Sequence, residues 1–148
     1  MAKKGEYVYE WPRPMVTVDA VVFLEGTRPK LLLIKRGKEP FKGKWAFPGG
    51  FVEMEEELED AVRRELAEET GLAGVKLEQM HTFGSCGRDP RGRQISIAFT
   101  GAVRAEQASL RPGDDAADAA WFDIDQLPEM AFDHNEIAKM AIEKLRSR

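Results

Sequence analysis

The chain has 148 residues, of which 43% are hydrophobic and 32% charged, and its formal net charge is −4. We expect a single domain over residues 1–148, since this length can bury one core comfortably but not two. The composition excludes a membrane-spanning protein, and the acidic balance argues against a nucleic-acid partner, which lysine and arginine would have to hold.

The N-terminus and the cysteine content both indicate a cytoplasmic protein. The first residues include two lysines but no apolar segment, so they do not resemble a secretory signal. The single cysteine, Cys86, cannot form an internal disulfide, and two histidines, His81 and His134, are too few to complete a zinc cluster with it. We expect Cys86 to be a thiol of the core.

The first half of the chain predicts a β-hairpin followed by a helix. Residues 15–25 and 30–36 are rich in β-branched and apolar residues and flank the turn sequence GTRP, which indicates two paired, buried strands. Residues 45–53 form a short extended piece interrupted by a proline and two glycines. Helical spacing covers residues 58–70 and stops at Gly71, a typical C-terminal cap.

The second half predicts further strands and a closing helix. Strands are expected at residues 75–82, 94–103 and 120–124, and an amphipathic helix at residues 133–146. The sequence LRPGDDAADAA, residues 110–120, is expected to be a loop. This order of elements predicts an α+β fold, an α/β/α sandwich in which helices cover both faces of a mixed β-sheet.

The predicted helix carries acidic side chains on the face that should be apolar. At roughly 100° per residue, Glu65 and Glu69 fall inside the apolar stripe, Glu68 lies on its edge and Arg64 lies just beyond. The stripe itself consists of Leu58, Ala61, Val62 and Leu66. Buried ionised carboxylates are costly without partners and repel one another, so a cation must lie among them.

A solvated acidic helix would explain the outward acidic residues but not the inward ones. Arg64 can pair with Glu68 four residues later, yet one guanidinium cannot neutralise three carboxylates. Carboxylates without histidine or thiolate nearby are hard oxygen ligands, so the sequence predicts Mg²⁺ or Mn²⁺ rather than zinc. Such an ion would also bind anionic phosphate groups.

The same stretch matches the Nudix box, which reads G, five residues, E, seven residues, REU, one residue, EE, one residue, GU, where U is bulky and aliphatic. All nine specified positions are filled at the required spacing. They are Gly50, Glu56, Arg64, Glu65, Leu66, Glu68, Glu69, Gly71 and Leu72. The chain therefore resembles the Nudix hydrolases, which cleave nucleoside diphosphates linked to another moiety, and the fold of that family agrees with the predicted elements.

The resemblance implies a role for each charged residue of the helix. Glu65 and Glu69 would be the principal metal ligands, and Glu68 a ligand or the base that activates water. Arg64 would orient the glutamates, so that Glu65, Glu68 and Arg64 form the expected catalytic group. Metal ions would neutralise the pyrophosphate oxygens, lower the pKa of a bound water and stabilise the leaving phosphate.

Two residues before the helix would complete the metal site. Glu56 resembles the upstream glutamate of the box, a further ligand or the partner of one, and the carbonyl of Gly49 would contact the metal. Many boxes have glycine before this glutamate and serine or threonine after it, where this chain has Glu55 and Glu57. The helix is therefore expected to be less well capped at its N-terminus.

Substrate choice must come from residues outside the box. The loop GRDPRGR, residues 87–93, resembles the corresponding segment of ADP-ribose pyrophosphatases, which makes Arg88 and Asp89 candidate substrate contacts; a solvated turn is the alternative. Arg36 is expected to reach a phosphate, because arginine binds phosphate through paired hydrogen bonds. Trp45 offers a stacking surface for a base, or is a core aromatic.

The ending of the chain, MAFDHNEIAKMAIEKL, also resembles Nudix domains of the ADP-ribose group. His134 within it is expected to anchor the last helix. Some relatives place an extra catalytic carboxylate in the loop that holds Asp114, Asp115 and Asp118, although an ordinary acidic loop is the simpler interpretation.

Hydrolysis of ADP-ribose to AMP and ribose 5-phosphate is the favoured function. The alternatives are hydrolysis of oxidised nucleoside triphosphates or nucleotide sugars, and, in a different class, a domain that senses ADP-ribose without cleaving it. The complete box and the end of the chain at Arg148 weigh against the sensor. The aromatic N-terminal segment YVYEWPRP could pack on a second copy, so a homodimer is a further expectation.

Overall fold

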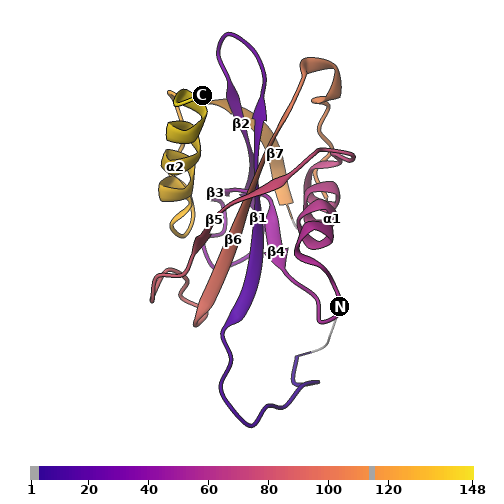
Figure 1. The fold of residues 1–148 in the computed structure, drawn as a ribbon, viewed down its shortest axis with the longest axis vertical. Helices are drawn as coiled ribbons and strands as arrows, with labels where there is room; N and C mark the ends of the chain where they lie inside the picture. The colour runs from indigo at the N-terminus through magenta and orange to yellow at the C-terminus, as the bar shows by residue number, and fades with distance from the viewer. Residues whose placement is uncertain (1–3, 114–115) are drawn as a thin grey trace.

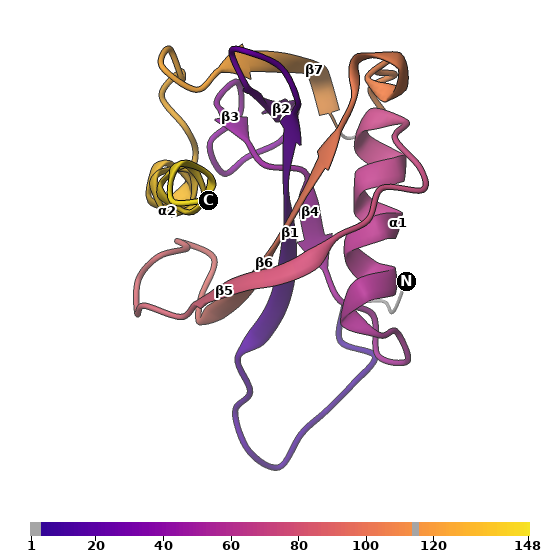
Figure 2. The same ribbon diagram turned by 45° about the horizontal axis from the view of Figure 1, so that its top comes forward.

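The structure, a computed structural model, describes residues 4–113 and 116–148, which form a seven-stranded mixed sheet between two helices (Figure 1). The strands are β1 (Met15–Leu24), β2 (Lys30–Arg36), β3 (Trp45–Ala46), β4 (Gly49–Phe51), β5 (Glu78–Phe83), β6 (Gln94–Val103) and β7 (Ala116–Asp123). The helices are α1 (Leu58–Thr70) and α2 (His134–Arg146), with a short 3-10 helix η1 (Ala105–Gln107). Figure 2 shows α1 and α2 on opposite faces of the sheet, which confirms the predicted α+β sandwich.

β1 is the central strand, and its two edges differ. One edge pairs with β6 in parallel along the whole of β1. The other edge is shared: its first half pairs with β4, where Asp19 lies opposite Gly49, and its end pairs with β2, where Phe23 lies opposite Leu31. β2 then continues away from β1 and pairs with β3 and β7. β2 and β4 therefore part from the same edge of β1, and the candidate site lies where they part.

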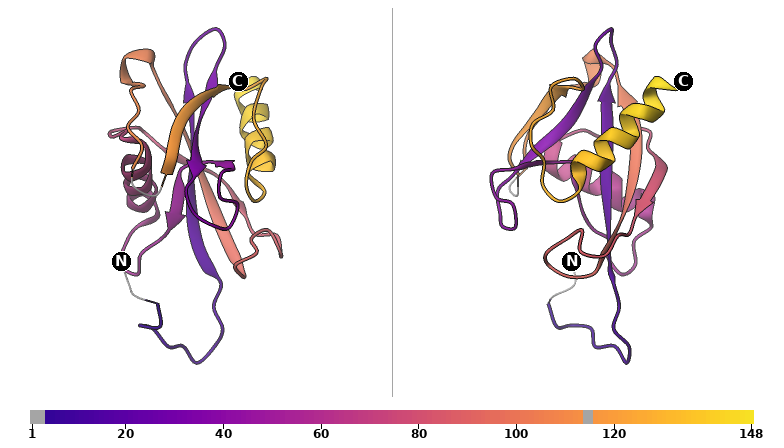
Figure 3. Two further views of the ribbon diagram at one scale, coloured as in Figure 1. Left: turned by 180° about the vertical axis from the view of Figure 1, so that it is seen from behind. Right: turned by 90° about the vertical axis from the view of Figure 1, so that its left-hand side faces the viewer.

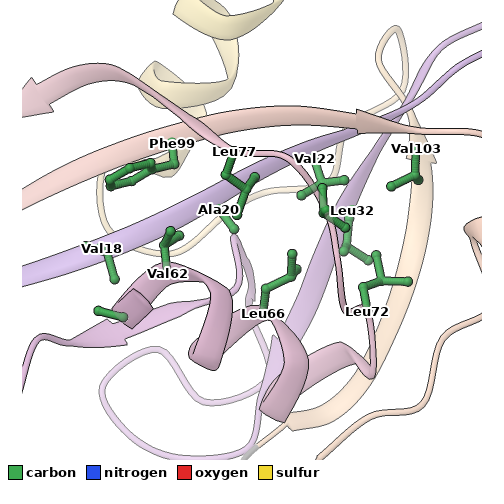
Figure 4. Packing of buried hydrophobic residues seen from close by; sticks show 12 residues of the cluster. Val18, Ala20, Val22, Leu32, Val62, Leu66, Leu72, Leu77, Phe99 and Val103 are labelled. Carbon is green, nitrogen blue, oxygen red and sulfur yellow. The ribbon is translucent and has the colours of Figure 1, made fainter. Parts of the chain in front are cut away.

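Alternate residues of β1 contribute to two separate cores, because successive side chains of a strand point to opposite faces. Val18 and Val22 pack with Leu66 of α1 in one core, which Figure 4 shows from close by. Val21 and Phe23 pack in the other core, under α2. Full burial of a side chain such as Leu66 stabilises the fold by about 1.5–3 kcal/mol.

The α2 face of the sheet changes from apolar to polar toward the beginnings of β1 and β6. Thr17 and Asp19 on β1, and Gln94 and Ser96 on β6, are buried on the face that carries Ala98 farther along. The Ser96 hydroxyl donates a hydrogen bond to the Asp19 carboxylate. Because buried polar groups cost free energy unless they are paired, this end of the sheet has a purpose other than packing.

α1 has the ends that the sequence predicts. Gly71 follows it in the left-handed region with φ 80°, and its N–H donates to the carbonyl of Ala67. At the other end Glu57 makes no side-chain capping hydrogen bond, in agreement with the weak N-terminal cap expected there. Among the described residues, no helix has the length and apolar character needed to cross a membrane.

β7 is longer than the sequence indicated. The strand was expected at residues 120–124 and the preceding residues as a loop, but β7 begins at Ala116, opposite Arg36 of β2. Pairing with β2 extends the strand across a bulge between Lys35 and Arg36, and the small, polar sequence of this part carries no strand signal of its own.

Two smaller expectations for the β5–β6 region are also wrong. β5 begins at Glu78 rather than at residue 75, because Val75 is buried in the core under α1 before the chain joins the sheet. Cys86 is exposed in the loop between β5 and β6 instead of lying in the core. In the N-terminal segment, Tyr7 and Trp11 are exposed, so the homodimer stays a prediction.

Candidate active site

Arg64 connects the acidic side chains around the beginning of α1. Its Nε and Nη2 donate to the two carboxylate oxygens of Glu56 at 2.7 and 2.9 Å, and its Nη1 donates to Glu65 at 2.9 Å. Nη2 also donates to the carbonyl of Phe51 at 3.2 Å, whereas Glu68 lies at 3.5 Å from Nη1. The hydrogen bonds between Arg64 and Glu56 raise the pKa of Arg64 and lower the pKa of Glu56.

Glu65 and Glu69, one helical turn apart, converge on the backbone of β4. The N–H of Gly49 donates to Oε1 of Glu69 at 2.8 Å, and a Cβ atom on Gly50 would lie 2.5 Å from Oε1 of Glu65. Burial raises the pKa of Glu69 to about 8, and the charges of Glu65 and Asp19 act in the same direction. Burial also raises the pKa of Glu65, against the effect of Arg64. Such a pair of carboxylates favours binding of a cation.

The donor set fits a hard divalent cation, since it consists of carboxylate and backbone oxygens. Glu68 lies at the rim, with 59% of its side chain exposed. In the part of the chain that the structure describes, no three acidic, histidine or cysteine side chains already stand together as a metal cluster. Arg64 forms ion pairs with Glu56 and Glu65, at 2.7 and 2.9 Å.

The carboxylates of α1 line an open cleft of about 770 Å³ at the point where β2 and β4 part. Basic side chains line the same cleft, namely Arg36, Lys38 and Arg91. The guanidinium groups of Arg36 and Arg91 lie over the ring of Phe132, at 5.0 and 5.3 Å from its centre. Burial, and then the charge of Arg91, lower the pKa of Arg36. The cleft thus combines a cation site with groups that bind anions.

A smaller recess of about 90 Å³ extends from this cleft on the α2 side of the sheet and shares Gly49 and Glu69 with it. The residues that line only the recess come from β1, the β3–β4 region, the β5–β6 loop, β6 and the beginning of α2. They include Thr17, Asp19, Phe47, Arg88, Asp89, Gln94, Phe132 and His134.

Side-chain hydrogen bonds anchor the β5–β6 loop to the beginning of α2, so it is not simply a solvated turn. Figure 3 shows this loop beyond the end of α2 at which the helix begins. Arg88 donates to both carboxylate oxygens of Asp133 at 2.9 and 2.6 Å, and 5% of its side chain is exposed. Asp89 is buried, but hydrogen bonds from the backbone and the guanidinium of Arg91 outweigh this burial and lower its pKa. Arg88 and Asp89 therefore line the recess with their main hydrogen-bonding groups already paired.

Trp45 is the predicted substrate contact that the structure places elsewhere. Its half-buried ring packs edge-on against Phe122, with ring centres 4.7 Å apart, and lies against the core under α2. Trp45 lines neither the cleft nor the recess, whereas Phe47, two residues later, lines the recess. Packing against this core accounts for the position of Trp45, since burial of a large aromatic surface stabilises the fold.

His134 anchors α2, as the sequence analysis expects. It is the first residue of the helix, and its Nδ1 accepts a hydrogen bond of 3.0 Å from the backbone N–H of Phe47. Burial lowers the pKa of His134, so the ring is neutral and its proton lies on Nε2, 3.8 Å from Asp19. Asp118, on β7, lines neither depression, and Asp114 and Asp115 lie outside the described residues.

Asp19, Gln94 and Phe132 are among the residues that line the site without having been predicted from the sequence. Asp19 had a detectable signal, because it is a charged residue within the strand sequence MVTVDAVVFL. Gln94 and Phe132 had none. Gln94 is placed by the register of β1 and β6, and Phe132 by the turn before α2, where its φ is 54°.

Comparison with known proteins agrees with this geometry. The family described as NUDIX domain matches residues 13–144. The chain belongs to the Nudix family. With its complete box it is a Nudix pyrophosphohydrolase, and its mixed sheet between two helices is the Nudix fold.

Two Nudix relatives are similar over most of this chain. The ADP-ribose pyrophosphatase of Methanocaldococcus jannaschii is 47% identical over 126 residues, which are 85% of this chain and 72% of the relative. The ADPR responsive transcriptional repressor NtrR of Acinetobacter baylyi is 31% identical over 146 residues, which are 94% of this chain but 57% of the repressor.

Two solved Nudix structures resemble the fold closely. The NUDIX domain of Shewanella oneidensis NrtR, complexed with ADP ribose, has a TM-score of 0.83 and 33% identity, covering 91% of this chain and 90% of that one. A MutT/nudix family protein from Enterococcus faecalis has a TM-score of 0.86 and 32% identity, covering 96% of this chain and 66% of that one.

Proposed function

We propose that the protein hydrolyses the pyrophosphate bond of ADP-ribose, giving AMP and ribose 5-phosphate, with Mg²⁺ or Mn²⁺ bound by the carboxylates of the box. One observation carries the proposal: the converging carboxylates of Glu65 and Glu69 line the same cleft as Arg36 and Arg91. A diphosphate needs both kinds of group, because a cation would neutralise part of its negative charge and guanidinium groups would bind its remaining oxygens. The similarity to the pyrophosphatase of Methanocaldococcus jannaschii supports ADP-ribose as the substrate.

The metal would be held by Glu65, Glu69 and the carbonyl of Gly49, with Glu68 closing the site from the rim. Glu56 would act through Arg64, because both of its oxygens accept hydrogen bonds from that guanidinium. When bound, the divalent cation neutralises the diphosphate oxygens and acidifies a water molecule.

Glu68 is the proposed general base, and Arg64 the residue that orients the glutamates. The Glu68 carboxylate is the most exposed of the inward acidic groups, and its contact with Arg64 is long at 3.5 Å, so it can turn toward an attacking water. Arg64 donates a hydrogen bond of 2.9 Å to the Glu65 carboxylate and so limits the positions that this carboxylate can take.

Arg36 and Arg91 are the proposed diphosphate contacts. Among the described residues, Arg36 has no carboxylate within ion-pair distance; its Nε donates to the carbonyl of Pro40 at 2.7 Å. Arg91 is held by Asp89 but keeps about a third of its side chain exposed at the cleft. Arg88 and Asp89 then contribute by fixing the loop that presents Arg91, rather than by direct contact.

A hydrolysis screen tests the proposal. The wild-type protein with Mg²⁺ or Mn²⁺ is assayed with ADP-ribose, NADH, diadenosine polyphosphates, nucleotide sugars and oxidised dGTP, and the substrates are ranked by kcat/KM. ADP-ribose is expected among the best substrates. Glu68→Gln should lower kcat by at least about 10²-fold, the scale for loss of a positioned base, while Glu59→Gln on the exposed face of α1 should not. A low rank for ADP-ribose overturns the substrate assignment.

A second candidate is a domain that binds ADP-ribose without cleaving it. The likeness to the NUDIX domain of Shewanella oneidensis NrtR, whose structure contains ADP ribose, favours it. This candidate would be favoured over the hydrolase if calorimetry detects binding of ADP-ribose and the assay detects no hydrolysis with either Mg²⁺ or Mn²⁺.

A further inference from the structure

Gln94 holds an unsatisfied hydrogen-bond donor at the recess. Among the described residues, its Nε2 is the one buried side-chain nitrogen or oxygen atom without a hydrogen-bond partner, and the residue is 1% exposed. Leaving such a buried donor unpaired costs free energy. Since Gln94 lines the recess, a partner for Nε2 can come from whatever occupies that space.

Arg91 fixes which end of the Gln94 amide is the donor. Nη2 of Arg91 donates to Oε1 of Gln94 at 3.5 Å, and a guanidinium has no acceptor, so the amide oxygen must face Arg91 and the nitrogen must face away. Arg91 is itself held by Asp89 through hydrogen bonds of 3.1 and 2.8 Å. The orientation of the amide is therefore set before any ligand arrives.

The neighbouring acceptors of the recess already have hydrogen-bond partners within the protein. The Asp19 carboxylate accepts from Ser96, and the Asp89 carboxylate accepts from Arg91. Nδ1 of His134 accepts from the backbone of Phe47. A ligand that fills the recess can bring a further acceptor atom to Nε2.

We propose that the recess receives the pentose of the substrate's non-nucleotide half, and that Nε2 of Gln94 donates a hydrogen bond to one of its oxygen atoms. This inference rests on the proposed function, and it assigns the non-nucleotide ribose of ADP-ribose to the recess. Gln94 is then a specificity-determining residue outside the Nudix box.

Size and polarity select the pentose over the purine. The recess of about 90 Å³ holds on the order of six water molecules, at about 10–15 Å³ of such volume for each. That is room for a sugar ring rather than for a purine nucleoside. Its walls carry Thr17, Asp19 and Gln94, which can form hydrogen bonds with the hydroxyl groups of a sugar.

Calorimetric titrations with ribose 5-phosphate and with AMP, each in the presence of Mg²⁺, test the inference without requiring turnover. Gln94→Glu keeps an acceptor for Arg91 and replaces the donor by oxygen, and Gln94→Met removes the amide without adding charge. Gln79→Met, at an exposed position of β5, is the matched control. Both Gln94 variants should weaken ribose 5-phosphate binding by about tenfold or more, the scale of a lost hydrogen bond to a buried donor, and change AMP binding less than about twofold.

Equal weakening of both ligands, selective weakening of AMP, or no change in either overturns the inference. It is also overturned if the wild-type protein does not bind ribose 5-phosphate. The same holds if Gln94→Met lowers the melting temperature of the ligand-free protein but leaves ribose 5-phosphate binding unchanged, since Nε2 would then have a partner within the protein. The hydrolysis screen separates the two proposals: absence of ADP-ribose turnover defeats the proposed function, while the two titrations still decide the role of Gln94.

Discussion

The backbone N–H of Gly49 donates a hydrogen bond of 2.8 Å to Oε1 of Glu69. This contact joins the last turn of α1 to β4 and keeps the carboxylate at the cleft, where burial raises its pKa to about 8. In the metal-free protein near neutral pH, Glu69 therefore holds a proton that a metal ion must displace.

The stability of the metal-free protein should depend on the charge of Glu69. In the unfolded chain Glu69 ionises near its usual pKa of about 4.3, so between about pH 5 and 8 the folded state binds the extra proton and loses stability as the pH rises. In chelator at pH 8, Glu69→Gln should increase the free energy of urea unfolding by at least about 1 kcal/mol, and this gain should vanish near pH 4. Glu68→Gln, at an exposed position, is the control. The prediction is contradicted if the unfolding free energies of Glu69→Gln and of the wild type change with pH in the same way.

Metal binding should stabilise the protein more strongly at high pH. Because the metal binds the ionised carboxylates and displaces the proton of Glu69, Mg²⁺ or Mn²⁺ should raise the melting temperature more at pH 8 than at pH 6. Differential scanning calorimetry over a metal titration measures this. In the double variant with Glu65→Gln and Glu69→Gln, the metal should not raise the melting temperature. If the metal raises it as much as in the wild type, the metal binds elsewhere.

Two adjacent glycines should respond differently to the same substitution. A Cβ at Gly49 would meet the carbonyl oxygen of Val18 and lie 3.1 Å from the Cα of Asp19, which are backbone atoms, so Gly49→Ala should destabilise the fold by about 1–3 kcal/mol. A Cβ at Gly50 would meet the side-chain carboxylate of Glu65 at 2.5 Å, which can move aside.

Gly50→Ala should therefore lower metal affinity, by about tenfold, with a smaller loss of stability than Gly49→Ala. Urea unfolding and metal titration of both variants provide the comparison. Equal stability losses in the two variants would show that the two glycines do not differ in this way.

The contributions of Arg64 and Glu56 to the free energy of unfolding should depend strongly on each other. Their bidentate contact at 2.7 and 2.9 Å involves side chains that are 27% and 13% exposed, so it is partly shielded from water. A double-mutant cycle with Arg64→Met and Glu56→Gln should give a coupling free energy of unfolding of about 1–2 kcal/mol. Arg63→Met with Asp60→Asn, an exposed pair at 3.8 Å on the same helix, is the matched control and should couple by less than about 0.5 kcal/mol.

The Arg88–Asp133 pair should determine how firmly the β5–β6 loop is held. Removing one partner leaves a largely buried charge, so Arg88→Met should cost about 3 kcal/mol of unfolding free energy. Replacing Asp133 as well, in Arg88→Met with Asp133→Leu, should restore at least part of this loss. Hydrogen exchange of residues 84–93 should accelerate in the single variant. Unchanged exchange there would mean that other contacts hold the loop.

The box and the helix that carries it could be predicted from the sequence because both depend on local spacing. The residues from Leu58 to Thr70 have helical periodicity, Gly71 supplies the left-handed cap, and Glu65 and Glu69 lie on the inner face for the same reason. The hairpin of β1 and β2 and the parallel strand β6 likewise follow from β-branched runs separated by turns.

The remaining features depend on pairings between distant residues, which local patterns do not encode. The sequence around Ala116 has no strand signal, and β7 forms there because β2 offers an unpaired edge. The sequence leaves Trp45 either a base-stacking ring or a core aromatic, and only the position of Phe122 shows that it packs against the core. Gln94 has no local signal either. Its position at the recess follows from the register of β6 on β1, and the lack of a partner for its amide nitrogen can be seen only when every neighbouring group has been placed.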